Sequence, residues 1–162
     1  AAHAPTRRAE TNHPKPQGNA PMKIAIASDH AAVDLKAELA QWLRDEGHEV
    51  ADLGPATADR VDYPDFGYKL ATAVASGAAE RGIALCGSGI GISIAANRVA
   101  GARCALVHDN LSARLSRQHN DANMISFGAR LTGVETARDA LRAFLETPFE
   151  GGRHAGRRDK LG

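Results

Sequence analysis

The chain has 162 residues, a length that suits one domain with a full hydrophobic core. Its 20 basic and 19 acidic side chains nearly balance, and aromatic residues make up only 4% of it. This composition provides neither the basic surface nor the stacking platforms of nucleic-acid-binding proteins. No apolar run approaches the roughly 20 residues that span a membrane. We therefore expect a soluble, cytoplasmic protein that binds neither nucleic acid nor a membrane.

Cysteine usage gives no support to metal or disulfide redox chemistry. The two cysteines, Cys86 and Cys104, fit neither a Cys-x-x-Cys pair nor the spacing of a zinc ligand set. We expect both to be reduced thiols of a cytoplasmic protein, and we expect no metal site.

The first 21 residues differ in composition from the rest. They contain four prolines, two adjacent arginines and no apolar segment, so they lack the hydrophobic region of a secretory signal. We interpret residues 1–21 as a disordered N-terminal extension and residues 22–162 as the folded domain.

From Lys23 onward, short apolar runs alternate with amphipathic segments. The apolar runs predict strands at residues 23–27, 48–53, 82–86, 103–107 and 124–127. Between them, helical spacing places apolar side chains on one face of each segment. These inward residues are Leu35, Leu39, Trp42 and Leu43, then Phe66, Leu70, Ala73 and Val74, and finally Val134, Ala137, Leu141, Phe144 and Leu145.

Start and stop signals support these helices. Gly47 ends the first helix and Pro64 opens the second. Asp109 and Asn110 are candidate caps for a helix over 110–118, and residues 132–135 have the spacing of a capping box. The isoleucines at 90, 92 and 94 alternate as in a strand, but Ala95-Ala96 and the alternating context favour a helix there.

Five strand-helix units in series predict an α/β fold, a single-domain, Rossmann-like three-layer α/β/α sandwich with a five-stranded parallel sheet. Ligands bind such sheets beyond the carboxyl ends of the strands. Polar clusters follow three predicted strands, at residues 28–30, 86–91 and 108–110, and we expect them to meet over one crevice. Within the last cluster, we favour His108 as a polar strand end over a second pocket histidine.

The stretch Cys86-Gly87-Ser88-Gly89-Ile90-Gly91 is the most informative part of the sequence. It lies between a buried strand and a helix, and its alternate glycines permit positive φ angles, so that several N–H groups can point at one anion. Cys86, at the rim of this loop, is a candidate base or nucleophile. Taken alone, the cysteine is more often a buried small residue, and the glycines more often serve packing.

A dinucleotide-dependent oxidoreductase is one alternative, because Asp109 follows the glycine loop by about 20 residues, as a ribose-binding acid does. The third glycine, Gly91, is however one position too early for Gly-x-Gly-x-x-Gly, and the chain has no room for a second substrate domain. The sequence therefore disfavours this alternative.

Five segments together resemble the family of ribose-5-phosphate isomerase B, which also includes galactose-6-phosphate isomerase subunits. The match runs in order from Met22 almost to the end of the chain. The matching segments are residues 27–31 (ASDHA), 62–65 (DYPD), 86–97 (CGSGIGISIAAN), 116–123 (SRQHNDAN) and 150–154 (EGGRH). The resemblance implies interconversion of D-ribose 5-phosphate and D-ribulose 5-phosphate through an enediol or enediolate, without a cofactor.

The resemblance also assigns roles in the chemistry. Cys86 matches the base that moves a proton between C2 and C1. The loop amides of residues 87–91 (Gly87, Ser88, Gly89, Ile90 and Gly91), with the Ser88 hydroxyl, match the groups that stabilise the oxyanion. A family subgroup uses a glutamate later in this loop instead of the cysteine. Here Ile92 and Ser93 follow and no carboxylate is present, so the cysteine mechanism is expected.

The remaining assignments concern the acid and the substrate. His119 matches the acid that opens the sugar ring, although a histidine at a helix end is more often a surface residue. The expected substrate-binding residues are Asp29, His30, Asn120, Arg130, Arg153 and Arg157, of which the arginines would hold the phosphate. Asp29 can also cap a helix. Without the resemblance, the arginines near the end of the chain would be interpreted as a solvated basic tail.

The resemblance further implies a homodimer, or a higher oligomer built from it, with active sites at the subunit interface. Allose 6-phosphate, galactose 6-phosphate and erythrulose 4-phosphate would undergo the same proton transfer, so each is an alternative substrate. A non-catalytic phosphosugar-binding module is a further alternative. It would keep the glycine loop and the arginines but would not need Cys86 together with His119.

Overall fold

The computed structural model describes residues 20–162, so nearly all of the predicted N-terminal extension lies outside the described residues. Its sheet has five strands, all parallel, in the order β2-β1-β3-β5-β4. The predicted five-stranded parallel sheet is therefore confirmed. The strands are β1 (Lys23–Ser28), β2 (Glu49–Asp52), β3 (Arg81–Cys86), β4 (Cys104–Leu106) and β5 (Met124–Gly128).

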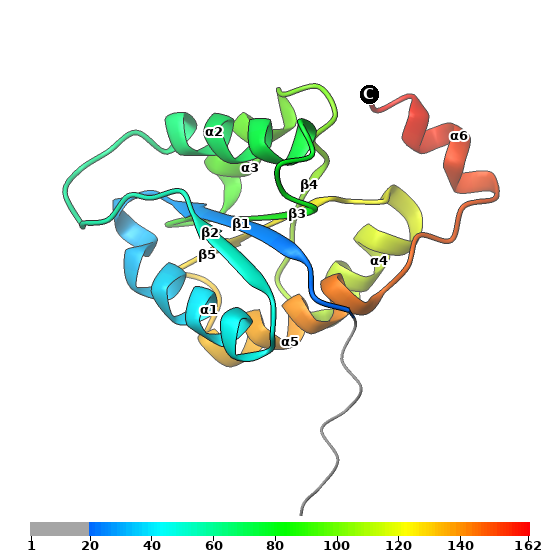
Figure 1. Ribbon diagram of the computed structural model, residues 1–162. Coiled ribbons are helices and arrows are strands. Elements are labelled where there is room, and N and C mark those ends of the chain that lie inside the picture. The colour runs from blue at the N-terminus through cyan, green and yellow to red at the C-terminus, as the bar shows by residue number, and fades with distance from the viewer. Residues whose placement is uncertain (1–19) are drawn as a thin grey trace, which may run out of the picture.

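Helices cover both faces of the sheet, as the sequence predicts (Figure 1). Helices α2 and α3 lie on one face, and α1, α4 and α5 on the other, whereas α6 projects from the body beside α4. None of the helices within residues 20–162 is long and apolar enough to cross a membrane. The helices are η1 (His30–Ala32), α1 (Val33–Asp45), α2 (Tyr63–Ala75), α3 (Ile90–Asn97), α4 (Asn110–Asn120), α5 (Val134–Glu146) and α6 (Arg153–Asp159).

The two faces of the sheet bury side chains of different size. Because strand residues alternate between faces, β1 sends Ile24 and Ile26 toward α1 and α5 but Ala25 and Ala27 toward α2 and α3. Small side chains let α2 and α3 pack closely, and a Cβ on Gly67 of α2 would lie 2.9 Å from that of Ala95 on α3. On this second face, β3 ends with Cys86.

Two local predictions need correction. Residues 132–135 do not form a capping box, because α5 begins at Val134 with Gly133 as its N-cap. The N–H of Thr132 donates to Gly128 O (2.9 Å) in a turn that follows β5, so the helix starts one residue later than predicted. In α2, Ala73 is only half-buried, whereas Ala71 is buried. Asp109, in contrast, caps α4 as predicted, accepting from the N–H of Ser112 at 2.7 Å.

Candidate active site

A pocket of about 560 Å³ lies beyond the carboxyl ends of β1 and β3. Two of the three predicted polar clusters, at residues 28–30 and 86–91, contribute to it, but the cluster at 108–110 does not. His108 thus remains outside the pocket, as favoured from the sequence. The pocket is lined by Asp29, His30, Ala31, Tyr63, Cys86, Gly87, Ser88, Ile90, Gly91, Ile94, Arg130 and Leu131.

Cys86 lies at the inner wall of this pocket, where it is 4% exposed. Its Sγ accepts a hydrogen bond of 3.1 Å from the N–H of Gly89. The next amide, that of Ile90, donates to Ser88 Oγ at 3.2 Å. The loop therefore directs backbone donors at the two side chains that the resemblance assigns to proton transfer and oxyanion binding.

The three alternate glycines of the loop serve different purposes. Only Gly89 has a positive φ, 78°, so the expectation that all three permit such angles holds at one position. A Cβ on Gly91 would lie 2.6 Å from the ring of Tyr63, so this glycine lets the tyrosine close one side of the pocket. Gly87 faces the guanidinium of Arg130, with its Cβ position 3.5 Å from Cζ.

Asp29 and His30, which directly follow β1, also line the pocket. One carboxylate oxygen of Asp29 accepts from the N–H of Ala31 at 2.9 Å, so Asp29 caps η1, as its alternative interpretation predicts, while it also lines the pocket. The Nδ1 of His30 lies 3.2 Å from both the N–H and the carbonyl oxygen of Val61. When His30 is neutral and accepts from that N–H, its Nε2 carries the proton.

Arg130 reaches the pocket from the turn after β5. Two hydrogen bonds join this turn to the glycine loop, from Ala129 N–H to Cys86 O (2.9 Å) and from Arg130 N–H to Gly87 O (3.0 Å). These backbone contacts fix the arginine beside the loop, where it can meet an anion.

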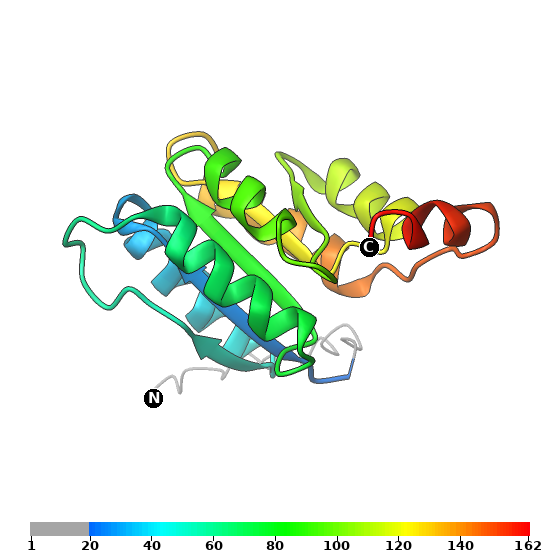
Figure 2. The same ribbon diagram turned by 90° about the horizontal axis from the view of Figure 1, so that it is seen from above.

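The other predicted site residues lie at the opposite edge of the sheet. His119 and Asn120 end helix α4, five and four positions before β5 begins at Met124, whereas Cys86 pairs with Gly128 at the end of β5. The length of β5, about 13 Å at 3.3 Å per residue, separates the two edges. Arg153 and Arg157 lie on α6, which lies beside α4 (Figure 2) and whose His154 contacts His119. The chain alone does not bring Cys86 and His119 together.

His119 stacks on His154, with ring centroids 4.5 Å apart and planes 15° from parallel. Burial, and then the charges of His119 and Arg153, lower the pKa of His154 below its usual value, although Glu150 acts in the opposite direction. His154 Nε2 lies 3.5 Å from Glu150 but makes no hydrogen bond.

Ligand atoms of His119, Glu150 and His154 lie within 4.8 Å of one another, close enough to raise the question of a metal ion. An imidazole binds a metal in the plane of its ring. Two nearly parallel, stacked rings cannot both point a nitrogen at one ion. In this arrangement the cluster is therefore a histidine stack and does not fit a metal.

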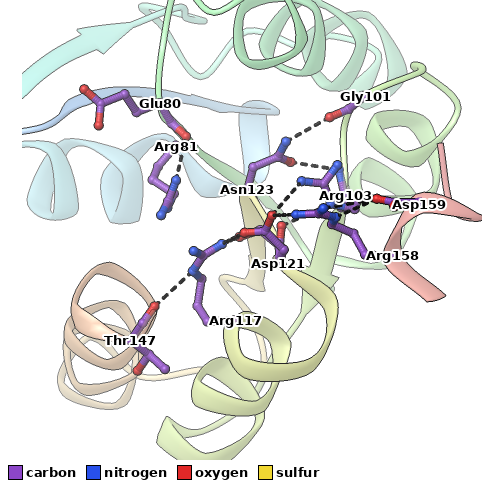
Figure 3. Close-up of polar contacts among 11 residues, drawn as sticks. Glu80, Arg81, Gly101, Arg103, Arg117, Asp121, Asn123, Thr147, Arg158 and Asp159 are labelled. Carbon is purple, nitrogen blue, oxygen red and sulfur yellow. Dashed lines mark hydrogen bonds and ion pairs between the residues drawn. The ribbon is translucent and has the colours of Figure 1, made fainter. Parts of the chain in front are cut away.

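A cluster of arginines surrounds Asp121, which directly follows Asn120 (Figure 3). The Asp121 carboxylate lies 2.8 Å from Arg158, 2.9 Å from Arg117 and 3.6 Å from Arg103. Partial burial alone would raise the pKa of Asp121, but hydrogen bonds from Arg158 and Arg117 outweigh it and lower that pKa. The edge of the sheet at the amino ends of the strands, here called the amino edge, is thus rich in positive charge around the ionised carboxylate of Asp121.

Several residues that line the pocket have no predicted role from the sequence. Tyr63, Ile94 and Leu131 line the pocket, with exposed fractions of 42%, 52% and 62%. Tyr63 belongs to one of the matching segments, which could have drawn attention to it. The sequence analysis predicts no helix at residues 153–159, where the structure has α6, because that segment has no apolar stripe.

Comparison with known proteins identifies the family of the chain. The family described as Ribose/Galactose Isomerase matches residues 24–161. Ribose-5-phosphate isomerase B of Escherichia coli is 46% identical over 82% of this chain and 89% of its own length. D-erythrulose-4-phosphate isomerase of Pectobacterium atrosepticum is 43% identical over 87% and 93% of the two lengths.

A solved structure extends the agreement to the fold. Ribose-5-phosphate isomerase B of Clostridium thermocellum superimposes with a TM-score of 0.86 at 50% identity, covering 87% of this chain and 95% of that one. Similarity at this level over most of both chains fixes the family as well as the fold. The chain therefore belongs to the ribose/galactose isomerase family and is a sugar-phosphate isomerase.

Proposed function

We propose that the chain interconverts D-ribose 5-phosphate and D-ribulose 5-phosphate. The observation that carries this proposal is a pocket lined by Cys86, Ser88 and Arg130. In it, Cys86 Sγ accepts a hydrogen bond from the N–H of Gly89. The similarity to proteins named ribose-5-phosphate isomerase B supports the choice of substrate. The reaction needs a base, donors for an oxyanion and an acid for ring opening, and the chain offers a candidate for each.

Ring opening comes first in the proposed mechanism. His119 donates a proton to the ring oxygen as the bond from that oxygen to C1 breaks, and the C1 hydroxyl releases its proton to solvent water as the C1 carbonyl forms. The product is the open-chain aldehyde, with its carbonyl at C1. Imidazole suits this step because its pKa lies near neutrality.

Proton transfer between carbons follows. The Cys86 thiolate removes the proton from C2, the electrons form the C1–C2 double bond, and the C1 oxygen becomes an oxyanion. Amides of the loop and Ser88 Oγ donate to that oxyanion. Cys86 then returns its proton to C1 while the O2 proton passes to O1, which leaves the ketone at C2. Arg130, Arg153 and Arg157 hold the phosphate, with Asp29, His30 and Asn120 on the sugar.

The mechanism requires a homodimer whose active sites combine both edges of the sheet. Within one chain, Cys86 lies at the carboxyl edge and His119 at the amino edge. A second copy can supply the missing half, and exposed apolar side chains around the pocket favour such a contact. Ile90, Ile94, Leu131 and Tyr63 expose between 42% and 62% of their surface there.

Turnover on a panel of substrates tests the function. The purified protein is given ribose 5-phosphate, allose 6-phosphate, galactose 6-phosphate and erythrulose 4-phosphate, and kcat/KM is compared with that of Cys86→Ala. We expect ribose 5-phosphate to be preferred, and Cys86→Ala to lose about 10²–10⁴-fold in kcat with an unchanged circular dichroism spectrum. Preference for another phosphate would keep the chemistry and change the substrate. Turnover of none would favour a binding module.

Mixing two inactive variants tests the shared active site. Cys86→Ala and His119→Ala are denatured together and refolded. In a mixed dimer, one of the two sites contains both native residues, so activity should return to about a quarter of the wild-type value. Each variant refolded alone is the control. Failure of the mixture to recover activity, with dimers present by light scattering, would contradict the shared site.

A further inference from the structure

Helix α6 is held to the rest of the chain mainly by polar contacts. Among its residues 153–159, only His154 is buried, so little apolar surface fixes the helix. Arg158 Nη1 lies 2.8 Å from Asp121 Oδ2, and the ring of His154 stacks on His119. Just before the helix, the N–H of Glu150 donates to Gln118 O at 3.1 Å. The position of α6 therefore depends on what α4 and Asp121 offer it.

The contacts of α6 divide its side chains into two pairs. His154 and Arg158, four residues apart, share one face of the helix and contact His119 and Asp121. Arg153 and Arg157, also four apart, are exposed and make no hydrogen bond or ion pair with any residue of the 20–162 range. Docking of the first pair thus fixes the direction in which the second pair projects.

Asp121 is well placed to control both elements. It adopts a left-handed conformation, φ 47°, and its N–H donates to Arg117 O at 3.2 Å, so it ends α4 directly after Asn120. Its carboxylate is meanwhile held by Arg117 and Arg103 (Figure 3). Because these contacts fix the carboxylate from the body of the chain, Arg158 meets a rigid partner.

We propose that Asp121 is a positioning residue of the isomerase: it ends α4 behind His119 and, through Arg158, orients the helix that presents Arg153 and Arg157 to the phosphate. This inference rests on the proposed function for the identity of the substrate. Asp121 acts through Arg158 and makes no contact with the sugar phosphate itself.

Replacing Arg158 with methionine removes its ion pairs with Asp121 and Asp159 and keeps an unbranched, flexible side chain. We expect the KM for ribose 5-phosphate and the inhibition constant of inorganic phosphate both to rise about 5–20-fold, while kcat changes less than about twofold, because the contact to the phosphate is equally strong in the ground state and the transition state. Arg153→Ala should reproduce this pattern. The matched control is Arg138→Met, which removes a 2.9 Å ion pair with Glu135 on α5 and should change none of these constants.

Asp121→Asn completes a double-mutant cycle, because asparagine also accepts the left-handed conformation and only the charge is lost. If Asp121 acts through Arg158, the fold-increase in KM of the double variant will be well below the product of the fold-increases of the two single variants. Independent, multiplicative effects would overturn the proposal. Should Asp121→Asn fail to fold, Arg158→Met alone decides, and wild-type constants in that variant would overturn it.

Calorimetric titration with inorganic phosphate separates this inference from the proposed function. If the wild type isomerises ribose 5-phosphate but Arg158→Met binds phosphate as tightly as the wild type, the inference is wrong and the function stands. If the wild type turns over no sugar phosphate but Arg158→Met still loses about 5-fold or more in phosphate affinity, the function is wrong and the inference stands.

Discussion

The two edges of the sheet hold their side chains by different physical means. At the carboxyl edge, the glycine loop fits against the turn after β5 so closely that a Cβ on Gly128 would lie 2.5 Å from the backbone of Ser88. At the amino edge, the Asp121 carboxylate contacts three arginines, which come from α4, from α6 and from the position directly before β4. Backbone shape fixes the first edge, and charge fixes the second.

The two edges are therefore sensitive to different changes. Close backbone packing is insensitive to pH and salt, but it does not tolerate an added methyl group. A partly exposed ion cluster tolerates changes of shape, but it depends on the ionisation of Asp121, the carboxylate that contacts all three arginines. Steric substitutions should therefore damage the carboxyl edge most, and charge or pH changes the amino edge.

The largest steric effect is expected at Gly89. Alanine there would combine a φ of 78° with a Cβ only 2.7 Å from the backbone carbon of Phe127. We expect Gly89→Ala to lower the free energy of unfolding by about 2–4 kcal/mol, measured by urea denaturation. Gly47→Ala is the matched control, because Gly47 has a φ of 97° with no atom within 4 Å of the added Cβ. It should cost about 1 kcal/mol. Equal losses in the two variants would show that packing against Phe127 is unimportant.

The carboxyl edge was largely predictable because its signals are local. The strand before Cys86, the glycines after it and the helix that follows lie within one short stretch, and the strand order of a parallel sheet then places Asp29 nearby. What the local pattern could not give was the separate purpose of each glycine. Gly91 makes room for Tyr63, which comes from another helix.

The amino edge was predictable only in part. Asp121 and Arg158 are 37 positions apart, and neither lies in an apolar pattern that would reveal their contact. Helix α6 has no hydrophobic face from which a helix could be predicted, because it is held by ion pairs and a histidine stack. The resemblance named His119, Arg153 and Arg157, but the residue that links them emerges only from the three-dimensional contacts.

A smaller effect, dependent on pH, is expected at the amino edge. The pKa of Asp121 is lower in the folded chain than its unfolded value of about 3.9, so its ionised form stabilises the fold above that pH. This contribution is lost as the pH falls through the folded pKa. We expect Asp121→Asn to be about 1–2 kcal/mol less stable than the wild type at pH 7 and for the difference to shrink below about pH 4.

Thermal unfolding from pH 7 to pH 2 measures this difference. Glu135→Gln is the control, because Glu135 forms an exposed pair with Arg138 and should change stability by less than about 0.5 kcal/mol at any pH. Parallel curves for the wild type and Asp121→Asn would mean that the Asp121 charge does not stabilise the amino edge.

The smallest effect is expected at the second cysteine, Cys104, and this comparison tests whether Cys86 is the reactive thiol. Cys104 lies on the edge strand β4, beside a separate cleft of about 400 Å³, and burial raises the pKa of its thiol to about 12. At pH 7.5 this thiol stays protonated and is a poor nucleophile. We expect Cys104→Ala to keep kcat/KM within about twofold of the wild type.

Iodoacetamide should inactivate the wild type and Cys104→Ala at the same rate, and mass spectrometry should find the label on Cys86. Protection of activity by the loss of Cys104 would instead place a reactive thiol away from the glycine loop.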